Sequence, residues 1–133
     1  MAAGAKVLLI DDDQDFKASV RALLESEGHS VVEADSGKQG LLKLAEEKPD
    51  LVVVDIMMAT STDGYGVTHA IRHRDDFREY RDIPIIMVSS IEQSPDDLFP
   101  MAGEVELIRP DMYLTKPLDM PKFLDSVRTA LQA

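Results

Sequence analysis

Short β-type runs alternate along this chain with longer stretches of helical periodicity. A run that is apolar at nearly every position is typical of a parallel strand buried on both faces. The runs predicted to be strands are Val7–Ile10, Ser30–Ala34, Leu51–Val54, Ile85–Val88 and Tyr113–Thr115.

The intervening stretches are predicted to be helices because their apolar residues recur three and four positions apart. Asp13 and Ser36 are expected to cap the first two helices, which Gly28 and Pro49 end. The apolar residues assigned to the helices are Phe16, Val20, Leu23, Leu24, Leu41, Leu42, Leu44, Ala45, Val67, Ala70, Ile71, Met120, Phe123, Leu124, Val127 and Leu131. Strands that alternate with helices predict an α/β fold with a parallel sheet covered on both sides. The arrangement we expect is a doubly wound, five-stranded sheet with strand order 2-1-3-4-5, within three α/β/α layers.

Composition narrows the class of protein. The 133 residues suit a single domain spanning residues 1–133. A formal net charge of -11 argues against direct binding to nucleic acid, and the lack of cysteine excludes disulfides and thiolate chemistry. No signal peptide and no apolar run long enough to span a membrane is visible, so we expect a soluble, cytoplasmic protein that binds no membrane.

The residues at the ends of the runs carry most of the candidate chemistry. Asp11 and Asp12 follow the first run, Asp55 the third, Ser89 the fourth and Lys116 the fifth. In an open α/β sheet, the carboxyl edge at a switch in strand order is where ligands bind. Carboxylates are hard ligands suited to Mg²⁺, and a hydroxyl with an ammonium suits a phosphate. A carboxylate can itself be the nucleophile in phosphoryl transfer, and this set is suited to that chemistry.

Four motifs resemble the receiver domains of two-component response regulators, over essentially the whole chain. They are Leu8–Asp13, Pro49–Asp55, Pro84–Ser90 and Tyr113–Pro117. The resemblance implies a flavodoxin-like fold and a chemotaxis-type single-domain regulator. It also implies that Asp55 accepts a phosphoryl group from a histidine kinase or phosphotransfer protein and thereby switches binding to a downstream protein target.

The same resemblance implies the remaining roles. Mg²⁺ would be held by Asp11, Asp12, Asp55 and the backbone carbonyl of Met57. Ser89 and Lys116 would contact the phosphoryl group, and Ser89 and Tyr113 would act as switch residues. The chain would then be a phosphoacceptor that catalyses its own phosphorylation rather than an enzyme that turns over substrate.

Two apolar residues bear on how fast the phosphoryl group would be lost. In the family, positions two after the phosphorylated aspartate and two after the switch hydroxyl influence the attacking water. These are Met57 and Ile91 here, which cannot position a water by hydrogen bonding. We therefore expect slow autodephosphorylation.

Two other classes stay open. Asp11 and Asp13 could form the Asp-x-Asp nucleophile pair of a haloacid-dehalogenase-like phosphatase, which would leave Asp55 unexplained. Alternatively, the chain could be a pseudo-receiver that binds proteins without being phosphorylated. His69 and His73 have the spacing of a zinc pair, but no cysteine or further histidine supports them.

The segment between Ser89 and Lys116 departs most from the family pattern, because it is longer than expected. Ser94 and Pro95 favour a helix start, but Pro100 disfavours helix at the residue before it. We expect one helical turn over 95–99 and an irregular segment up to about Asp111. Smaller departures are Ala59 in place of a proline, a displaced Asp63-Gly64 pair, and Ser90 where a smaller residue is common.

Overall fold

The computed structural model describes residues 4–55, 63–90, 112–116 and 118–132. Its strands are β1 (Lys6–Ile10), β2 (Ser30–Ala34), β3 (Leu51–Asp55), β4 (Ile85–Ser90) and β5 (Met112–Lys116). Its helices are α1 (Gln14–Ser26), α2 (Gly37–Glu47), α3 (Asp63–His73) and α6 (Met120–Gln132), with a 3-10 helix η1 (Asp75–Tyr80).

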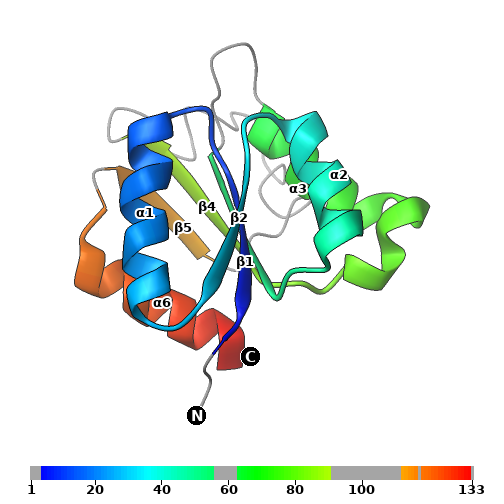
Figure 1. Ribbon diagram of the computed structural model, residues 1–133. Coiled ribbons are helices and arrows are strands. Elements are labelled where there is room, and N and C mark those ends of the chain that lie inside the picture. The colour runs from blue at the N-terminus through cyan, green and yellow to red at the C-terminus, as the bar shows by residue number, and fades with distance from the viewer. Residues whose placement is uncertain (1–3, 56–62, 91–111, 117, 133) are drawn as a thin grey trace.

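The strands form one parallel sheet in the order β2-β1-β3-β4-β5, which confirms the predicted order (Figure 1). The central pair is in register with Leu8 beside Val52 and Ile10 beside Val54. Because the chain reverses its direction of winding between β1 and β3, the carboxyl ends of these two strands lie at the switch point of the sheet.

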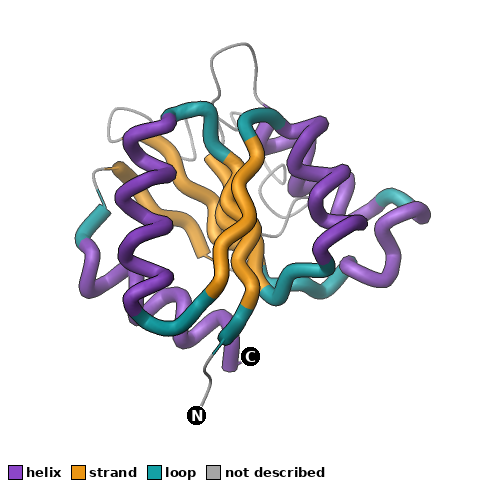
Figure 2. The backbone as a smooth tube through the Cα atoms, viewed as in Figure 1, coloured by secondary structure: helices purple, strands orange, loops and turns teal. Residues whose placement is uncertain are grey.

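Helices cover both faces of the sheet, in the three layers predicted (Figure 2). On one face, α1 and α6 bury Val20, Leu24, Phe123 and Val127 against the sheet. On the other, Leu44 of α2 and the buried residues of α3 pack in a second core together with the remaining strand side chains. Val7–Ile10 of β1 and all of β3 are buried, so ligands can reach these central strands at their ends.

The first two helices begin and end as predicted. The side chain of Asp13 accepts a hydrogen bond from the backbone N–H of Phe16 (3.1 Å), and Ser36 caps α2 in the same way. Gly28, just beyond α1, has a positive φ of 88°, which glycine adopts without strain. Lys48 ends α2 in the left-handed region with φ 49°, directly before Pro49.

One glycine sets how closely α2 approaches the sheet. A side chain at Gly40 would overlap the side chain of Ile10, with Cβ only 2.9 Å from Cγ1. Ile10 is fully buried at the end of β1, directly before Asp11. Glycine at position 40 therefore allows α2 to pack directly over the end of the strand that leads into the candidate site.

The structure differs from the predictions at several places. Leu42 is 59% exposed, and Ala45 is also exposed, because the face of α2 that meets the sheet carries Gly37, Gly40 and Leu44 instead. The helix η1 was not predicted; it is held by Phe77, which is buried in the core.

Other predictions concern residues that are not described. The predicted helical turn and irregular segment over 94–111 lie outside the described residues, as do Met57, Ala59 and Ile91. Within the described ranges, no helix combines the length and apolar character needed to cross a membrane.

Candidate functional site

Three carboxylates meet at the carboxyl ends of β1 and β3. Because Ile10 is aligned with Val54, the next residues, Asp11 and Asp55, lie side by side. Both are buried, at 1% and 6% exposure, whereas Asp12 is partly exposed. One oxygen from each of the three carboxylates lies within 4.8 Å of the others. The predicted acidic residues are therefore brought together as one group.

Backbone hydrogen bonds hold Asp11 in place. Its N–H donates to the carbonyl of Ala34 at the end of β2 (3.0 Å), and its Oδ1 accepts from the N–H of Asp13 (2.9 Å). Asp13 is at the same time the N-cap of α1. The orientation of the Asp11 carboxylate is thus tied to the start of α1 and to the end of β2.

The donor set decides which ion could be held at this group. All three side chains offer carboxylate oxygen, and in the described part of the chain no histidine belongs to a group of three or more potential ligands. Hard oxygen donors at short mutual distance suit Mg²⁺, whereas zinc prefers nitrogen and sulfur ligands. The residues present therefore fit a magnesium ion.

The other predicted site residues are placed by their strands. Val88 is aligned with Asp55, so Ser89 follows one position further along the neighbouring strand, where it pairs with Thr115. Lys116 is the last residue of β5 and pairs with Ser90. β4 and β5 therefore bring their carboxyl ends, with Ser89 and Lys116, to the edge that holds the carboxylates.

The remaining predicted residues are Tyr113 and the histidine pair on α3. Tyr113 lies further back on β5, aligned with Met87. The rings of His69 and His73 on α3 are 4.7 Å apart, but in the described residues these two do not join a group of three potential ligands. The structure therefore adds no third ligand to the histidine pair.

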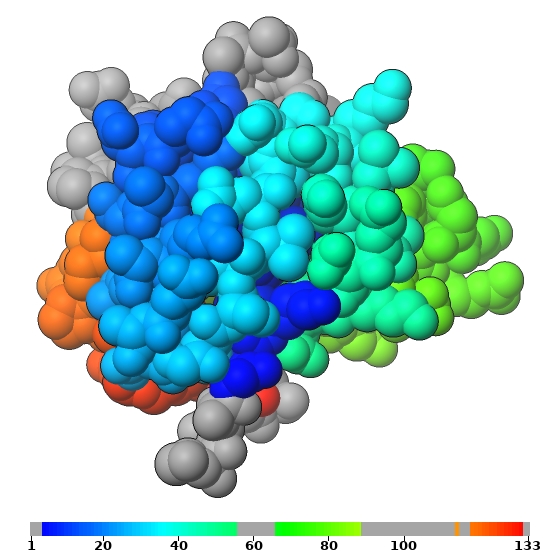
Figure 3. Space-filling model, viewed as in Figure 1, coloured from blue at the N-terminus to red at the C-terminus, as the bar shows by residue number. Residues whose placement is uncertain are grey.

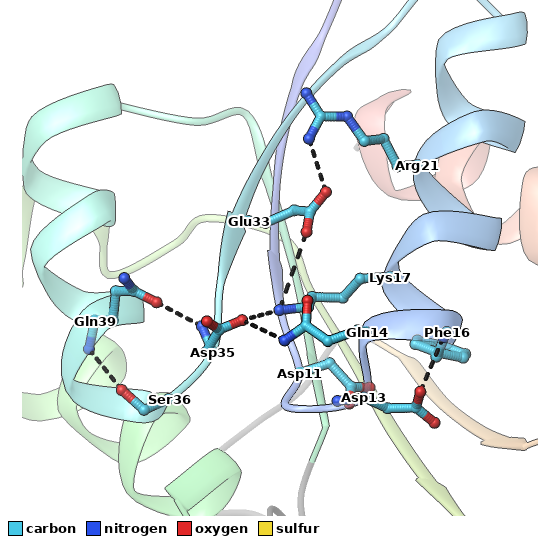
Figure 4. Close-up of polar contacts among 10 residues, drawn as sticks. All are labelled: Asp11, Asp13, Gln14, Phe16, Lys17, Arg21, Glu33, Asp35, Ser36 and Gln39. Atoms are coloured by element: carbon cyan, nitrogen blue, oxygen red, sulfur yellow. Dashed lines mark hydrogen bonds and ion pairs between the residues drawn. The ribbon is translucent and has the colours of Figure 1, made fainter.

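A buried cation near the carboxylates was missed by the sequence analysis. The side chain of Lys17 is only 1% exposed and forms an ion pair and a hydrogen bond with Asp35, with Glu33 4.0 Å away (Figure 4). A signal was present, since Lys17 shares the face of α1 that carries Val20 and Leu24. A lysine at an apolar position of a helix indicates burial beside an acidic partner.

Charge pairing shifts the pKa of two groups in this network. The hydrogen bond from Lys17, helped by one from Gln14, lowers the pKa of the Asp35 carboxyl. Hydrogen bonds to Glu33 and Glu25 raise the pKa of Arg21, one helical turn further along α1. The network therefore favours the charged form of both groups.

The chain belongs to the response regulator receiver domain family, whose pattern matches residues 7–128. It is 34% identical to Protein PilG of Pseudomonas aeruginosa over 94% of this chain and 86% of PilG. It is 32% identical to Protein PilH of the same organism, over 96% and 98% of the two chains. The fold resembles that of the chemotaxis protein CheY4 of Vibrio cholerae, with a TM-score of 0.82 and 27% identity over 97% of this chain and all of the other.

Family membership makes this chain a receiver of two-component signalling, a class that interacts with histidine kinases and downstream targets. The phosphatase alternative receives no support, because Asp13, half of its proposed nucleophile pair, is engaged as the cap of α1.

Proposed function

We propose that Asp55 is the phosphoacceptor and that Asp11, Asp12 and Asp55 hold the Mg²⁺ needed for the reaction. The observation that carries this proposal is the convergence of three carboxylates within 4.8 Å, two of them buried, at the switch point of the sheet. Gathering three like charges at one edge costs folding free energy that a bound cation would offset, which supports a metal-binding role.

In the proposed reaction, a carboxylate oxygen of Asp55 attacks the phosphorus of a phosphohistidine on the donor. The P–N bond to the donor's imidazole breaks as the P–O bond to Asp55 forms, and the imidazole leaves with the electron pair. Bound Mg²⁺ supplies positive charge for the phosphoryl oxygens. Ser89 and Lys116 are proposed to donate hydrogen bonds to those oxygens, and the carbonyl of Met57 to complete the metal ligands.

The proposal extends to partners and to the switch. The donor is a histidine kinase or a phosphotransfer protein, and the acceptor of the signal is a downstream protein in the cytoplasm. Ser89 and Tyr113 are proposed to transmit phosphorylation to the surface that this target binds. Residues 1–133 act as one receiver domain, and the apolar residues at 57 and 91 slow the loss of the phosphoryl group.

Mass spectrometry after incubation with acetyl phosphate and Mg²⁺ tests the assignment. We expect the wild-type chain to gain one phosphoryl group and Asp55→Asn to gain none, because the amide is nearly the same size but a far weaker nucleophile. Asp50→Asn, at the opposite end of β3, is the matched control and should be phosphorylated normally. Absence of any uptake by the wild-type chain would instead favour a pseudo-receiver.

A further inference from the structure

The buried ammonium of Lys17 links two turns that flank the candidate site. Lys17 lies in α1, whose first residue follows directly after the acidic turn over 11–13. Its partner, Asp35, lies in the turn between β2 and α2. Figure 4 shows the lysine reaching across from α1 to the carboxylate of Asp35. The ion pair therefore joins the turn after β1 to the turn after β2.

Asp35 is held from three sides. Its Oδ1 accepts hydrogen bonds from both Lys17 and Gln14 of α1, and its backbone N–H donates to Oε1 of Gln39 in α2 (2.6 Å). Gln39 also donates its backbone N–H to the capping Ser36 (3.1 Å). Asp35 is thus fixed relative to the first turns of both helices.

The same two turns determine the position of Asp11. Its N–H is bonded to Ala34, the neighbour of Asp35, and its carboxylate accepts from Asp13 at the start of α1. If Lys17 released Asp35, α1 would keep its cap but lose one of its two side-chain contacts with the turn after β2, leaving only the hydrogen bond from Gln14. The Asp11 carboxylate would then be less well fixed relative to Asp55.

We propose that Lys17 is a positioning residue for the carboxylate site, acting through Asp35 on the turn that carries Asp11 and Asp12. The inference rests on the proposed function, because the property it governs is the affinity of those carboxylates for Mg²⁺. Residues that orient metal ligands typically change metal affinity by about 10–100-fold when they are mutated, and an indirect positioning residue belongs at the lower end.

The interaction can be removed without exposing the fold to a buried, unpaired charge. The carboxylate side chains of Asp35 and Glu33 are 61% and 28% exposed, so water can solvate them once the lysine is gone. Methionine is similar in length to lysine and apolar, and it suits the buried position at residue 17. Lys17→Met is therefore expected to fold.

The sign of the effect separates positioning from simple electrostatics. Lys17→Met removes a positive charge near an anionic site, so a purely electrostatic role predicts tighter Mg²⁺ binding. Positioning predicts weaker binding, by about tenfold. Asp35→Ala, which removes the acceptor, should weaken binding as well. Arg21→Met removes the same charge from α1 one turn away, where Arg21 bonds Glu33 and Glu25 instead, and should leave the affinity within about twofold.

The experiment measures Mg²⁺ binding by titration calorimetry and amide exchange by NMR, on the full chain. The N–H of Asp11, bonded to Ala34, reports the turn directly, and the N–H of Val52, bonded to Pro84 at the other end of β3, is the internal reference. We expect Lys17→Met to speed exchange at Asp11 by at least about threefold without changing Val52.

Three outcomes are distinguishable. Weaker binding and faster Asp11 exchange in Lys17→Met and Asp35→Ala, but not in Arg21→Met, would support the proposal. Unchanged or tighter Mg²⁺ binding in Lys17→Met would overturn it while leaving the phosphoacceptor assignment intact. A wild-type chain that binds no Mg²⁺ would remove the proposed function itself, and with it a positioning role toward the metal.

Discussion

Acidic side chains have different surroundings at the two ends of the β1–β3 pair. At the amino end, Lys6 and Asp50 are bonded twice: the N–H of Lys6 donates to Oδ2 of Asp50 (2.8 Å), and the N–H of Asp50 donates to the carbonyl of Lys6 (2.7 Å). The ammonium of Lys6 also pairs with Glu47 (3.3 Å). At the carboxyl end, the same two strands bring Asp11 and Asp55 together with Asp12.

The two ends of the β1–β3 pair differ in how their negative charges are balanced. At the amino end, negative charges are satisfied by a cation and by backbone donors, an arrangement that stabilises the fold modestly. At the carboxyl end, three like charges lie within 4.8 Å of one another, and a bound cation would offset their mutual repulsion. The amino end is therefore suited to stabilising the fold, and the carboxyl end to the cation binding proposed above.

The largest expected effect is that of Mg²⁺ on stability. If the carboxylate cluster binds the ion only in the folded state, free Mg²⁺ at about 100 times its Kd raises the free energy of unfolding by about 2.7 kcal/mol. In Asp12→Ala, with an affinity lower by about tenfold, the same concentration should give only about 1.4 kcal/mol. Urea unfolding followed by circular dichroism, at matched ionic strength, measures both. An equal gain in the two proteins would place the ion elsewhere.

Neutralising one buried carboxylate should stabilise the protein, whereas most mutations of buried residues destabilise it. Without Mg²⁺, we expect Asp55→Asn to raise the free energy of unfolding by about 1–2 kcal/mol, because it relieves repulsion among partly desolvated like charges. Asp50→Asn should lower it by about 0.5–1 kcal/mol, since it weakens a bond to Lys6. The same unfolding measurement compares the two, and a loss of stability in both would contradict the contrast.

The smallest expected effect is a change in stability at low pH. Because Lys17 lowers the pKa of Asp35, the folded protein binds a proton there less readily than the unfolded chain does. This contribution is present at neutral pH and is lost as the pH falls below about 4, through the folded pKa of Asp35. The stability difference between wild type and Lys17→Met should therefore shrink in that range. Asp35 is 61% exposed, so salt should reduce the effect further, and a difference that grew at low pH would contradict it.

Much of the fold could be predicted because the strands are apolar on both faces and the turns carry specific caps. Asp13 and Ser36 cap their helices as expected, and the alternation of strands with helices predicts a parallel sheet. The acidic cluster was also predictable, since parallel strands end at one edge and the aspartates come directly after or at the last residue of their strands.

The parts that were not predicted depend on contacts between distant segments. Lys17 became recognisable as a buried cation only when the turn after β2 placed Asp35 beside it. Leu42 looked like a core residue until the side of α2 that faces the sheet was fixed by Gly40 and Leu44. Periodicity indicates that a helix has an apolar face, but a short helix with leucines on two sides does not specify which side is buried.

The close contact at Gly40 restricts which residues fit at position 40. A methyl group at this position would collide with Ile10, so even alanine, the residue that helices favour most, would have to displace the side chain that directly precedes Asp11. A residue without a side chain, on the face of α2 that meets the sheet, thereby limits what can stand next to the strand end that leads into the acidic residues. We expect any larger residue at position 40 to shift the side chain that directly precedes the Asp11 carboxylate.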